Sequence, residues 1–184
     1  VGMVLMLNKH LFRSNIQVRN SIWKRETNRG SELMGKTFAI IGYGFMGEAL
    51  AERLSGFGVN VIAYDKYKND FSSSIVKQVT LHEVFNSADF VSLHTPLSNE
   101  TIGMVNNDFI SKFRKSFVLI NSARGKSVVL KDLVEGLKSG KIAGACLDVL
   151  EIESSSFEKV EVSSNKHFNS LIEMDNVVLS PHIA

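Results

Sequence analysis

The chain of 184 residues has little cysteine, little proline and little excess charge of either sign. Its single cysteine, Cys146, excludes an internal disulfide framework and favours a reducing, cytoplasmic environment. The 21 Lys and Arg residues against 19 Asp and Glu leave a net charge of +2, too small an excess to indicate nucleic acid as a partner. The apolar stretch at residues 1–7 is far shorter than the ~20 residues that cross a bilayer, and it lacks the features of a signal peptide. We therefore expect neither a nucleic-acid nor a membrane partner.

Short apolar runs dominate the chain from residue 36 onward, and amphipathic segments separate them. The expected strands are residues 38–41, 59–64, 90–93, 117–120, 143–150 and 177–179, and the expected helices are residues 46–57, 81–87, 107–113 and 130–139. Apolar runs without polar alternation are typical of strands that are buried on both faces. Their alternation with helices predicts an α/β fold with a doubly wound, mostly parallel sheet.

The two ends of the chain differ from this pattern. Residues 3–25 predict one helix or two, followed by a polar turn at residues 27–31. We expect residues 1–30 to form a helical segment that belongs to one structural unit with the main domain, residues 31–184. The Ser-rich stretch at 154–164, with its extension to 169, predicts a surface loop. The chain opens inside an expected helix and stops directly after an expected strand, which favours part of a longer protein over a complete small one.

A glycine-rich loop joins the first expected strand to the following helix. Gly42 permits a tight turn, Gly44 allows close approach of a pyrophosphate, and Gly47 allows the helix to pack against the strand. The second strand ends in Asp65, which suits the ribose hydroxyls of NAD and repels the 2′-phosphate of NADP. The pattern predicts an NAD site. A glycine turn that binds nothing and a methyltransferase, which shares the loop and the acid, are the alternatives.

Polar clusters follow several expected strands, where ligands bind in open α/β sheets. They contain, in chain order, His94 and Thr95, then Asn121 to Gly125, then Asp148 with Glu151 and Glu153, and finally His182. Each has a simpler explanation alone; His94, for example, can merely cap a strand. Together they supply an acid–base histidine, a carboxylate and an arginine for an anionic substrate.

Five stretches of the sequence carry a family resemblance: residues 32–44, 88–97, 119–125, 145–153 and 176–184. In these stretches the chain resembles the Rossmann-type NAD-binding domain of the D-isomer-specific 2-hydroxyacid dehydrogenases, particularly the D-3-phosphoglycerate dehydrogenase branch. The resemblance implies catalytic roles for Arg124, Glu153 and His182. It implies cofactor contacts for Gly42, Gly44, Phe45, Met46, Gly47, Asp65, Thr95, Asn121, Ser122, Ala123, Asp148 and His182. The family usually has proline after the glutamate, whereas this chain has Ser154.

The resemblance also implies an activity and a partner. The intact enzyme would oxidise a D-2-hydroxy acid, with 3-phosphoglycerate as the leading substrate, to the 2-oxo acid with NAD and no metal. The family's separate substrate domain is absent from these residues, so we expect this chain alone to fold but to be inactive. The helical segment, with Trp23, agrees with a homodimer, although a helix that packs on its own sheet is a rival interpretation. An NAD-sensing protein that resembles the related corepressors is the alternative function.

Overall fold

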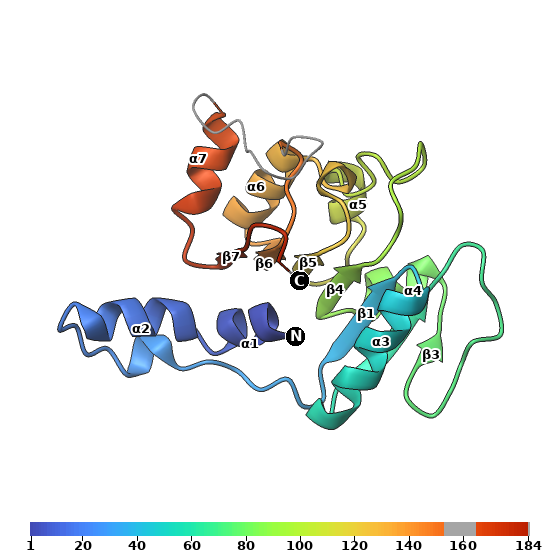
Figure 1. The fold of residues 1–184 in the computed structure, drawn as a ribbon, viewed down its shortest axis with the longest axis horizontal. Coiled ribbons are helices and arrows are strands. Elements are labelled where there is room, and N and C mark those ends of the chain that lie inside the picture. The colour runs from blue at the N-terminus through green and yellow to red at the C-terminus, as the bar shows by residue number, and fades with distance from the viewer. Residues whose placement is uncertain (153–164, 184) are drawn as a thin grey trace.

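A parallel sheet of seven strands runs through the middle of the molecule, in the computed structural model that describes residues 1–152 and 165–183 (Figure 1). The strand order is β3-β2-β1-β4-β5-β6-β7. The strands are β1 (Thr37–Ile41), β2 (Asn60–Tyr64), β3 (Lys77–Gln78), β4 (Phe90–Leu93), β5 (Phe117–Asn121), β6 (Ile142–Leu147) and β7 (Val177–Leu179). All pairings are parallel, which confirms the predicted doubly wound α/β fold.

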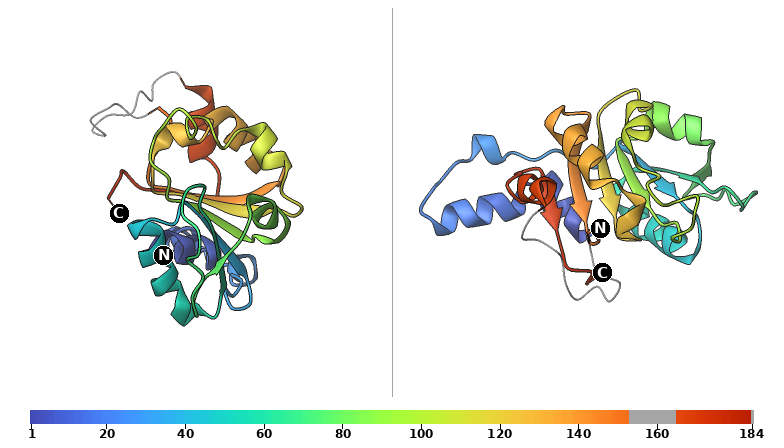
Figure 2. Two further views of the ribbon diagram at one scale, coloured as in Figure 1. Left: turned by 90° about the vertical axis from the view of Figure 1, so that its right-hand side faces the viewer. Right: turned by 90° about the horizontal axis from the view of Figure 1, so that it is seen from above.

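Helices cover both faces of the sheet, as the edge-on view in Figure 2 shows. The helices are α1 (Gly2–Asn8), α2 (Leu11–Arg19), α3 (Phe45–Leu54), α4 (Leu81–Ser87), α5 (Asn107–Ser111), α6 (Leu130–Lys138) and α7 (Lys166–Ile172), with 3₁₀ turns η1 (Glu26–Asn28), η2 (Ser55–Phe57) and η3 (Gly125–Ser127). Buried side chains of α4 to α7 share one core cluster, and those of α1 and α3 share the other. The sheet is therefore the middle of three layers.

The central strands are apolar on both faces because each face carries a core. In β1, Ala39 and Ile41 join the cluster under α4 to α7, while Phe38 and Ile40 join the opposite cluster. This arrangement explains why the strands lack polar alternation in the sequence.

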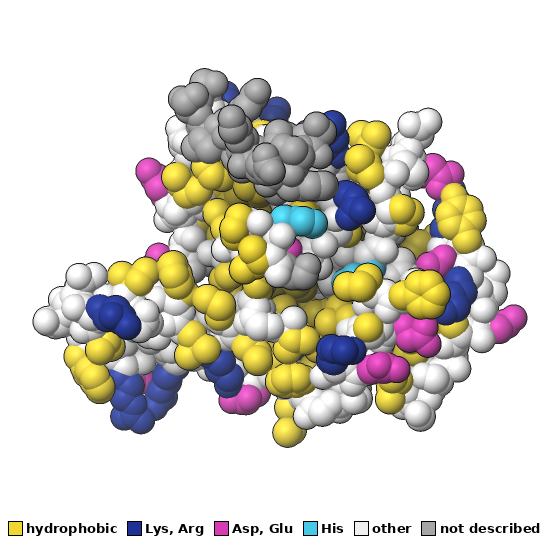
Figure 3. Space-filling view, viewed as in Figure 1, with side chains coloured by type: hydrophobic (Ala, Val, Ile, Leu, Met, Phe, Trp, Pro, Cys, Tyr) yellow, Lys and Arg dark blue, Asp and Glu magenta, His cyan; other side chains and the backbone are white. Residues whose placement is uncertain are grey.

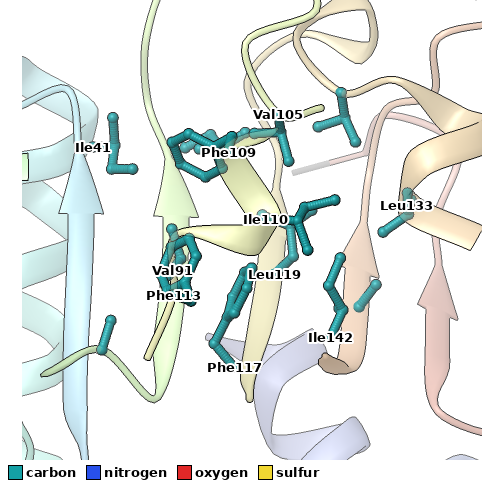
Figure 4. Packing of buried hydrophobic residues seen from close by; sticks show 14 of the residues in the cluster. Ile41, Val91, Val105, Phe109, Ile110, Phe113, Phe117, Leu119, Leu133 and Ile142 are labelled. Carbon is teal, nitrogen blue, oxygen red and sulfur yellow. The ribbon is translucent and has the colours of Figure 1, made fainter. Parts of the chain in front are cut away.

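Aromatic rings fill the larger of the two cores (Figure 4). The ring of Phe113 stacks on Phe117 with centroids 3.8 Å apart and meets Phe85 and Phe109 edge-on at 5.0 and 5.5 Å. Edge-on and offset contacts of this kind stabilise aromatic clusters beyond simple burial. The cluster ties α4 and α5 to the face of the sheet opposite α3.

The two N-terminal helices have different surroundings. Val4 and Leu7 of α1 are buried in the second core, and a β-carbon on Gly144 of β6 would lie 3.0 Å from Leu7 Cδ2. Helix α2 instead projects beyond the sheet (Figure 1) and has no buried residue. Helix α1 thus packs on its own sheet, whereas α2 leaves apolar side chains exposed.

Several expected boundaries were wrong. The strand expected at 143–150 starts at Ile142 and ends at Leu147, since the chain turns at Asp148 to leave the sheet. The helices expected at 46–57 and 107–113 end early, at Leu54 and Ser111, and the first continues as the 3₁₀ turn η2.

Two elements were missed altogether. The extension of the Ser-rich loop to residue 169 was wrong, because α7 starts at Lys166. Asn165 is the N-cap of this helix. Its side-chain oxygen accepts hydrogen bonds from the His167 and Phe168 amides at 3.0 and 3.2 Å. The remaining loop, at 154–164, lies outside the described residues. Strand β3 has only two residues, both polar, and so carries no apolar signal.

Within the described part of the chain, no helix is long and apolar enough to cross a membrane.

Candidate active site

The carboxyl ends of six strands line up at one edge of the sheet. The pairing register aligns the residues at these ends in the order Tyr64, Ile41, Leu93, Asn121, Leu147 and Leu179. Each polar cluster of the sequence follows one member of this row within a few residues. The fold therefore brings together groups that are more than 100 residues apart in the chain.

A cavity of about 370 Å³ opens at this edge where the strand order reverses between β1 and β4. Such a switch point is where ligands bind in open α/β sheets. The predicted residues Gly42, Gly44, Asp65 and Thr95 line the cavity. Leu81, the first residue of α4, and Met104, in the segment after β4, add apolar walls that sequence analysis missed, since they come from separate parts of the chain and carry no motif.

The glycine loop has the shape that a dinucleotide requires. A β-carbon on Gly42, whose φ is 93°, would lie 2.8 Å from the His94 carbonyl, and one on Gly47 would lie 2.5 Å from the Gly42 oxygen. Over Gly44, by contrast, there is no atom within 4 Å of that position. Glycine is thus needed at two positions for packing, while the third leaves open space for a ligand to approach the backbone.

Helix α3 starts at this open space. Its first residue, Phe45, is 93% exposed, and Met46 is also exposed. Gly44 precedes the helix and no side chain caps it, so the first backbone N–H groups and the positive end of the helix dipole face the loop. This arrangement suits a pyrophosphate.

The carboxylate of Asp65 is held by backbone groups on both sides. Oδ2 accepts a hydrogen bond from the Tyr43 amide at 2.7 Å, and Oδ1 accepts from the Tyr67 and Lys68 amides at 2.9 and 3.0 Å. Partial burial opposes ionisation, but these three hydrogen bonds outweigh it and lower the pKa of Asp65. The group is therefore an anion that lines the cavity at neutral pH.

Two polar groups from the end of β4 complete this side of the cavity. Thr95 Oγ1 is buried and has no hydrogen-bond partner among the described residues, so it can serve a bound molecule. His94 lies 2.9 Å from Ser92 Oγ through Nε2, and burial lowers its pKa to about 4. His94 is therefore neutral at pH 7, in keeping with a packing role.

The open glycine loop, the anionic Asp65 and the free Thr95 hydroxyl fit NAD. They offer a place for the pyrophosphate, for the ribose hydroxyls and for a further polar contact, respectively.

Lys66, Tyr67 and Glu100 form a bridge across the cavity rim that sequence analysis missed. The Lys66 ammonium lies 2.7 Å from Glu100 Oε1, and the Tyr67 hydroxyl donates to Glu100 Oε2 at 2.7 Å. Lys66 and Glu100 are 34 positions apart and each stands in a polar turn, so no local pattern connects them.

The loop after β5 carries the predicted arginine. Buried Asn121 holds this loop. Its side-chain NH₂ group donates to the Arg124 carbonyl at 3.0 Å, and its side-chain oxygen accepts from the Ala123 backbone amide at 3.1 Å. Ser122 lies between these anchors. The guanidinium of Arg124 is exposed and donates to the Ala123 carbonyl at 2.7 Å. No other hydrogen bond from this side chain to a described residue is formed, and because the residue is exposed an anion can reach its remaining donors.

The last described residues bring the predicted histidine beside a buried carboxylate. Asp148 is 0% exposed and accepts hydrogen bonds from Ser180 Oγ at 2.5 Å and the Ile183 amide at 3.1 Å. His182 has a positive φ of 55°, and its amide donates to the Asp148 carbonyl at 2.9 Å. Its Nδ1 lies 3.9 Å from Asp148 Oδ2, a charge-pair distance rather than a hydrogen bond. Histidine side chains occupy the centre of the face in Figure 3.

The two glutamates after β6 have separate positions. Glu151 Oε2 accepts a hydrogen bond from the Leu130 amide at 2.7 Å, at the start of α6. Glu151 therefore has a structural task, because that helix start has no other side-chain cap. Glu153, which we prefer as the catalytic acid, lies outside the described residues.

Comparison with known proteins agrees with this geometry. A sequence model described as "D-isomer specific 2-hydroxyacid dehydrogenase, NAD binding domain" matches residues 1–184. The chain belongs to this family. Its residues form the NAD-binding domain, with NAD as the cofactor.

Individual relatives have different substrates in their names. The chain is 34% identical to a hydroxypyruvate reductase of Thermotoga maritima, covering 100% of this chain and 57% of the relative. It is 37% identical to a D-3-phosphoglycerate dehydrogenase of Bacillus subtilis, covering 99% of this chain and 33% of the relative. The crystal structure of a D-lactate dehydrogenase with NAD+ from Lactobacillus jensenii aligns with a TM-score of 0.85 at 30% identity, over 98% of this chain and 56% of that one. The chain thus spans between a third and three fifths of the relatives it matches.

Proposed function

We propose that the protein reversibly oxidises a small D-2-hydroxy acid to the corresponding 2-oxo acid with NAD. The observation that carries this proposal is the alignment of strand ends, which gathers the NAD cavity, Arg124 and His182 at one edge of the sheet. An arginine for a carboxylate and a histidine for a hydroxyl proton are the groups that this oxidation needs.

Each residue has a defined task in this proposal. Bound NAD supplies the hydride acceptor. Arg124 binds the substrate carboxylate with its free N–H groups and orients the neighbouring carbon. His182 takes the hydroxyl proton on Nε2, the ring nitrogen opposite the Nδ1 that faces Asp148. We assign Glu153 to holding the imidazole in position for this proton transfer.

The cofactor residues follow the same edge. We assign the pyrophosphate to Gly42, Gly44, Phe45, Met46 and Gly47, and the adenosine ribose to Asp65. We assign the nicotinamide half to Thr95, Asn121, Ser122, Ala123, Asp148 and His182.

The substrate is proposed as a class. Relatives named for hydroxypyruvate, 3-phosphoglycerate and lactate are 34–37% identical to this chain, so identity alone favours none of them. We take 3-phosphoglycerate as the first acid to test, because the motif stretches most resemble that branch.

Nucleotide binding is the first test. We expect calorimetric titration to give NADH at least about tenfold tighter binding than NADPH. Asp65→Ala should abolish that preference, since it removes both the ribose acceptor and the repulsion of a 2′-phosphate. Equal affinity of the wild-type chain for both nucleotides would contradict the proposed cofactor site.

Turnover is the second test and uses the full gene product. With NAD present, 3-phosphoglycerate, D-lactate and D-glycerate are screened by NADH absorbance. Arg124→Gln and His182→Gln should each lower kcat/KM by about a hundredfold or more, while NADH affinity of Arg124→Gln should stay near wild type. A full-length protein that binds NADH but oxidises none of these acids would favour the NAD-sensing alternative.

We further propose that the protein is a homodimer that pairs through α2. The support is a set of exposed apolar side chains on α2, which has no buried residue, and on the segment that follows it: Leu11, Phe12, Ile16 and Val18 on the helix, and Ile22 and Trp23 after it. Sedimentation should show a dimer at micromolar concentration and a monomer for Phe12→Glu. Met34→Glu, at another exposed apolar side chain, is the control. A wild-type monomer would contradict the proposal.

A further inference from the structure

The bridge of Lys66, Tyr67 and Glu100 stands where a cofactor with a 2′-phosphate would be distinguished from one without. Lys66 and Tyr67 directly follow Asp65 at the end of β2, and Glu100 lies in the turn after β4. All four residues line the cavity that we assign to NAD, and Asp65 is the residue to which we assign the adenosine ribose. The charges of these side chains therefore interact with the ribose end of the cofactor.

Lys66 is the one cation at neutral pH among the described residues that line this cavity. The other basic lining residue is His94, which is neutral because burial lowers its pKa. Lys68 is nearby in sequence but is not part of the lining, and its ammonium lies 5.0 Å from the Tyr43 ring centroid and 5.8 Å from that of Phe71. A 2′-phosphate in the cavity would need a cation, and Lys66 is the candidate.

Glu100 holds that cation in place. Its Oε1 pairs with the Lys66 ammonium and its Oε2 accepts from the Tyr67 hydroxyl, so both carboxylate oxygens are engaged. The same ammonium lies 5.4 Å from the Tyr67 ring centroid. Consistent with this contact, the hydrogen bond to Glu100 raises the pKa of Lys66 and the hydrogen bond from Lys66 lowers the pKa of Glu100. Lys66 is thus charged but already paired.

We propose that Glu100 is a second determinant of the preference for NAD over NADP, acting as a positioning residue that keeps Lys66 away from a 2′-phosphate. This inference rests on the proposed NAD site. A 2′-phosphate beside Asp65 would meet two carboxylates, Asp65 and Glu100. Among the described lining residues, the one cation it could use, Lys66, is already engaged by Glu100. Like charges at short range disfavour such binding, and the effect weakens as salt screens it.

The test compares the NADPH-to-NADH affinity ratio of single and double variants by calorimetric titration. Glu100→Gln frees Lys66 and should raise this ratio about fivefold to tenfold at low salt, with most of the gain lost at 0.5 M salt. Lys66→Gln alone should change the ratio by less than about twofold, since the lysine is already paired. Adding Lys66→Gln to Glu100→Gln should remove most of the gain, namely the part that the freed lysine provides, and leave only the part that comes from the lost repulsion by Glu100.

A matched control separates this mechanism from a change in net charge. Glu135→Gln removes the same charge from an exposed glutamate on α6 that lies 3.9 Å from Lys131, and it should leave the ratio unchanged. A merely structural role of Glu100 would weaken both nucleotides equally and leave the ratio as it is. Glu100→Ala provides a second variant with the same expectation as Glu100→Gln.

The outcomes distinguish the two levels of the proposal. If the wild-type chain prefers NADH and neither Glu100 variant changes the ratio, the role of Glu100 is overturned while the NAD site stands. If the wild-type chain shows no preference for NADH, both the proposed site and this inference fail.

Discussion

The backbone of Gly125 lies so close to the carbonyl of Leu150 that a β-carbon on the glycine would be 1.9 Å from the carbonyl oxygen. This contact joins the loop that carries Arg124 to the segment that leads toward Glu153. Neither backbone can shift alone, because Asn121 holds the first loop and Glu151 ties the second to α6. The loop that carries the proposed substrate arginine therefore packs directly against the backbone at Leu150, three positions before the proposed partner of the histidine in the sequence.

Gly125→Ala should destabilise the protein strongly. No side chain can move aside to relieve a clash with a backbone oxygen, so we expect the free energy of unfolding to fall by more than about 2 kcal/mol. Urea denaturation measures this loss. Gly56→Ala, where no atom lies within 4 Å of the added carbon, is the control and should stay close to wild type. Similar midpoints for the two variants would show that the two loops are not packed as described.

Alanine at two positions of the glycine loop should separate folding from cofactor binding. Gly47→Ala places a carbon 2.5 Å from the Gly42 oxygen and should lower the free energy of unfolding by roughly 1–3 kcal/mol. Gly44→Ala meets no atom and has a negative φ, so its stability should stay within about 0.5 kcal/mol of wild type.

The same Gly44→Ala variant should lose NADH affinity by about tenfold or more, since the new methyl occupies the space next to the pyrophosphate. Calorimetry and urea denaturation of the two variants together make the test. Wild-type NADH affinity in Gly44→Ala would place the pyrophosphate elsewhere.

Stability should fall in mild acid because of His94. Burial lowers its pKa from 6.5 to about 4. Below pH 6.5, His94 is therefore protonated in the unfolded chain but stays neutral in the folded chain. The stabilisation is complete above pH 6.5 and is lost as the pH falls toward 4. The loss should reach roughly 2 kcal/mol between pH 7.5 and 5.

Urea denaturation at several pH values checks this expectation. In His94→Asn the free energy of unfolding should change much less over the same interval, whatever its value at pH 7.5. If the free energy of unfolding of the variant fell as much as that of the wild type over this interval, a group other than His94 would be responsible.

The central strands and the glycine loop could be predicted because their signals are local. A run such as residues 38–41 is buried on both faces, and the three glycines mark the start of a helix within six positions. Strand β3 and α7 could not be predicted, because the first has two polar residues and the second has Leu171 as its one buried residue.

Parts of the candidate site were also beyond sequence reasoning. Nothing near Glu100 in sequence marks it as the partner of Lys66, since the contact exists only after β2 and β4 are placed on either side of β1. The choice of Glu153 over Glu151 came from the family resemblance. The structure adds a physical reason to set Glu151 aside, which is its hydrogen bond to the start of α6.

The single cysteine should report cofactor binding from inside the sheet. Cys146 is fully buried in β6, and burial raises the pKa of its thiol to about 12. Since the thiolate is the reactive form, the folded protein should not react with a disulfide reagent such as DTNB, and labelling should require unfolding.

A ligand that binds only the folded state then lowers the unfolded population, and with it the labelling rate, by a factor of one plus the ratio of the free ligand concentration to Kd. Where labelling is limited by the unfolded population, NADH at about 100 times its dissociation constant should slow the reaction roughly a hundredfold. NADPH at the same concentration should slow it far less if Asp65 and Glu100 exclude the 2′-phosphate. Fast labelling of the native chain would mean that β6 opens locally, and equal protection by the two nucleotides would contradict the preference for NAD.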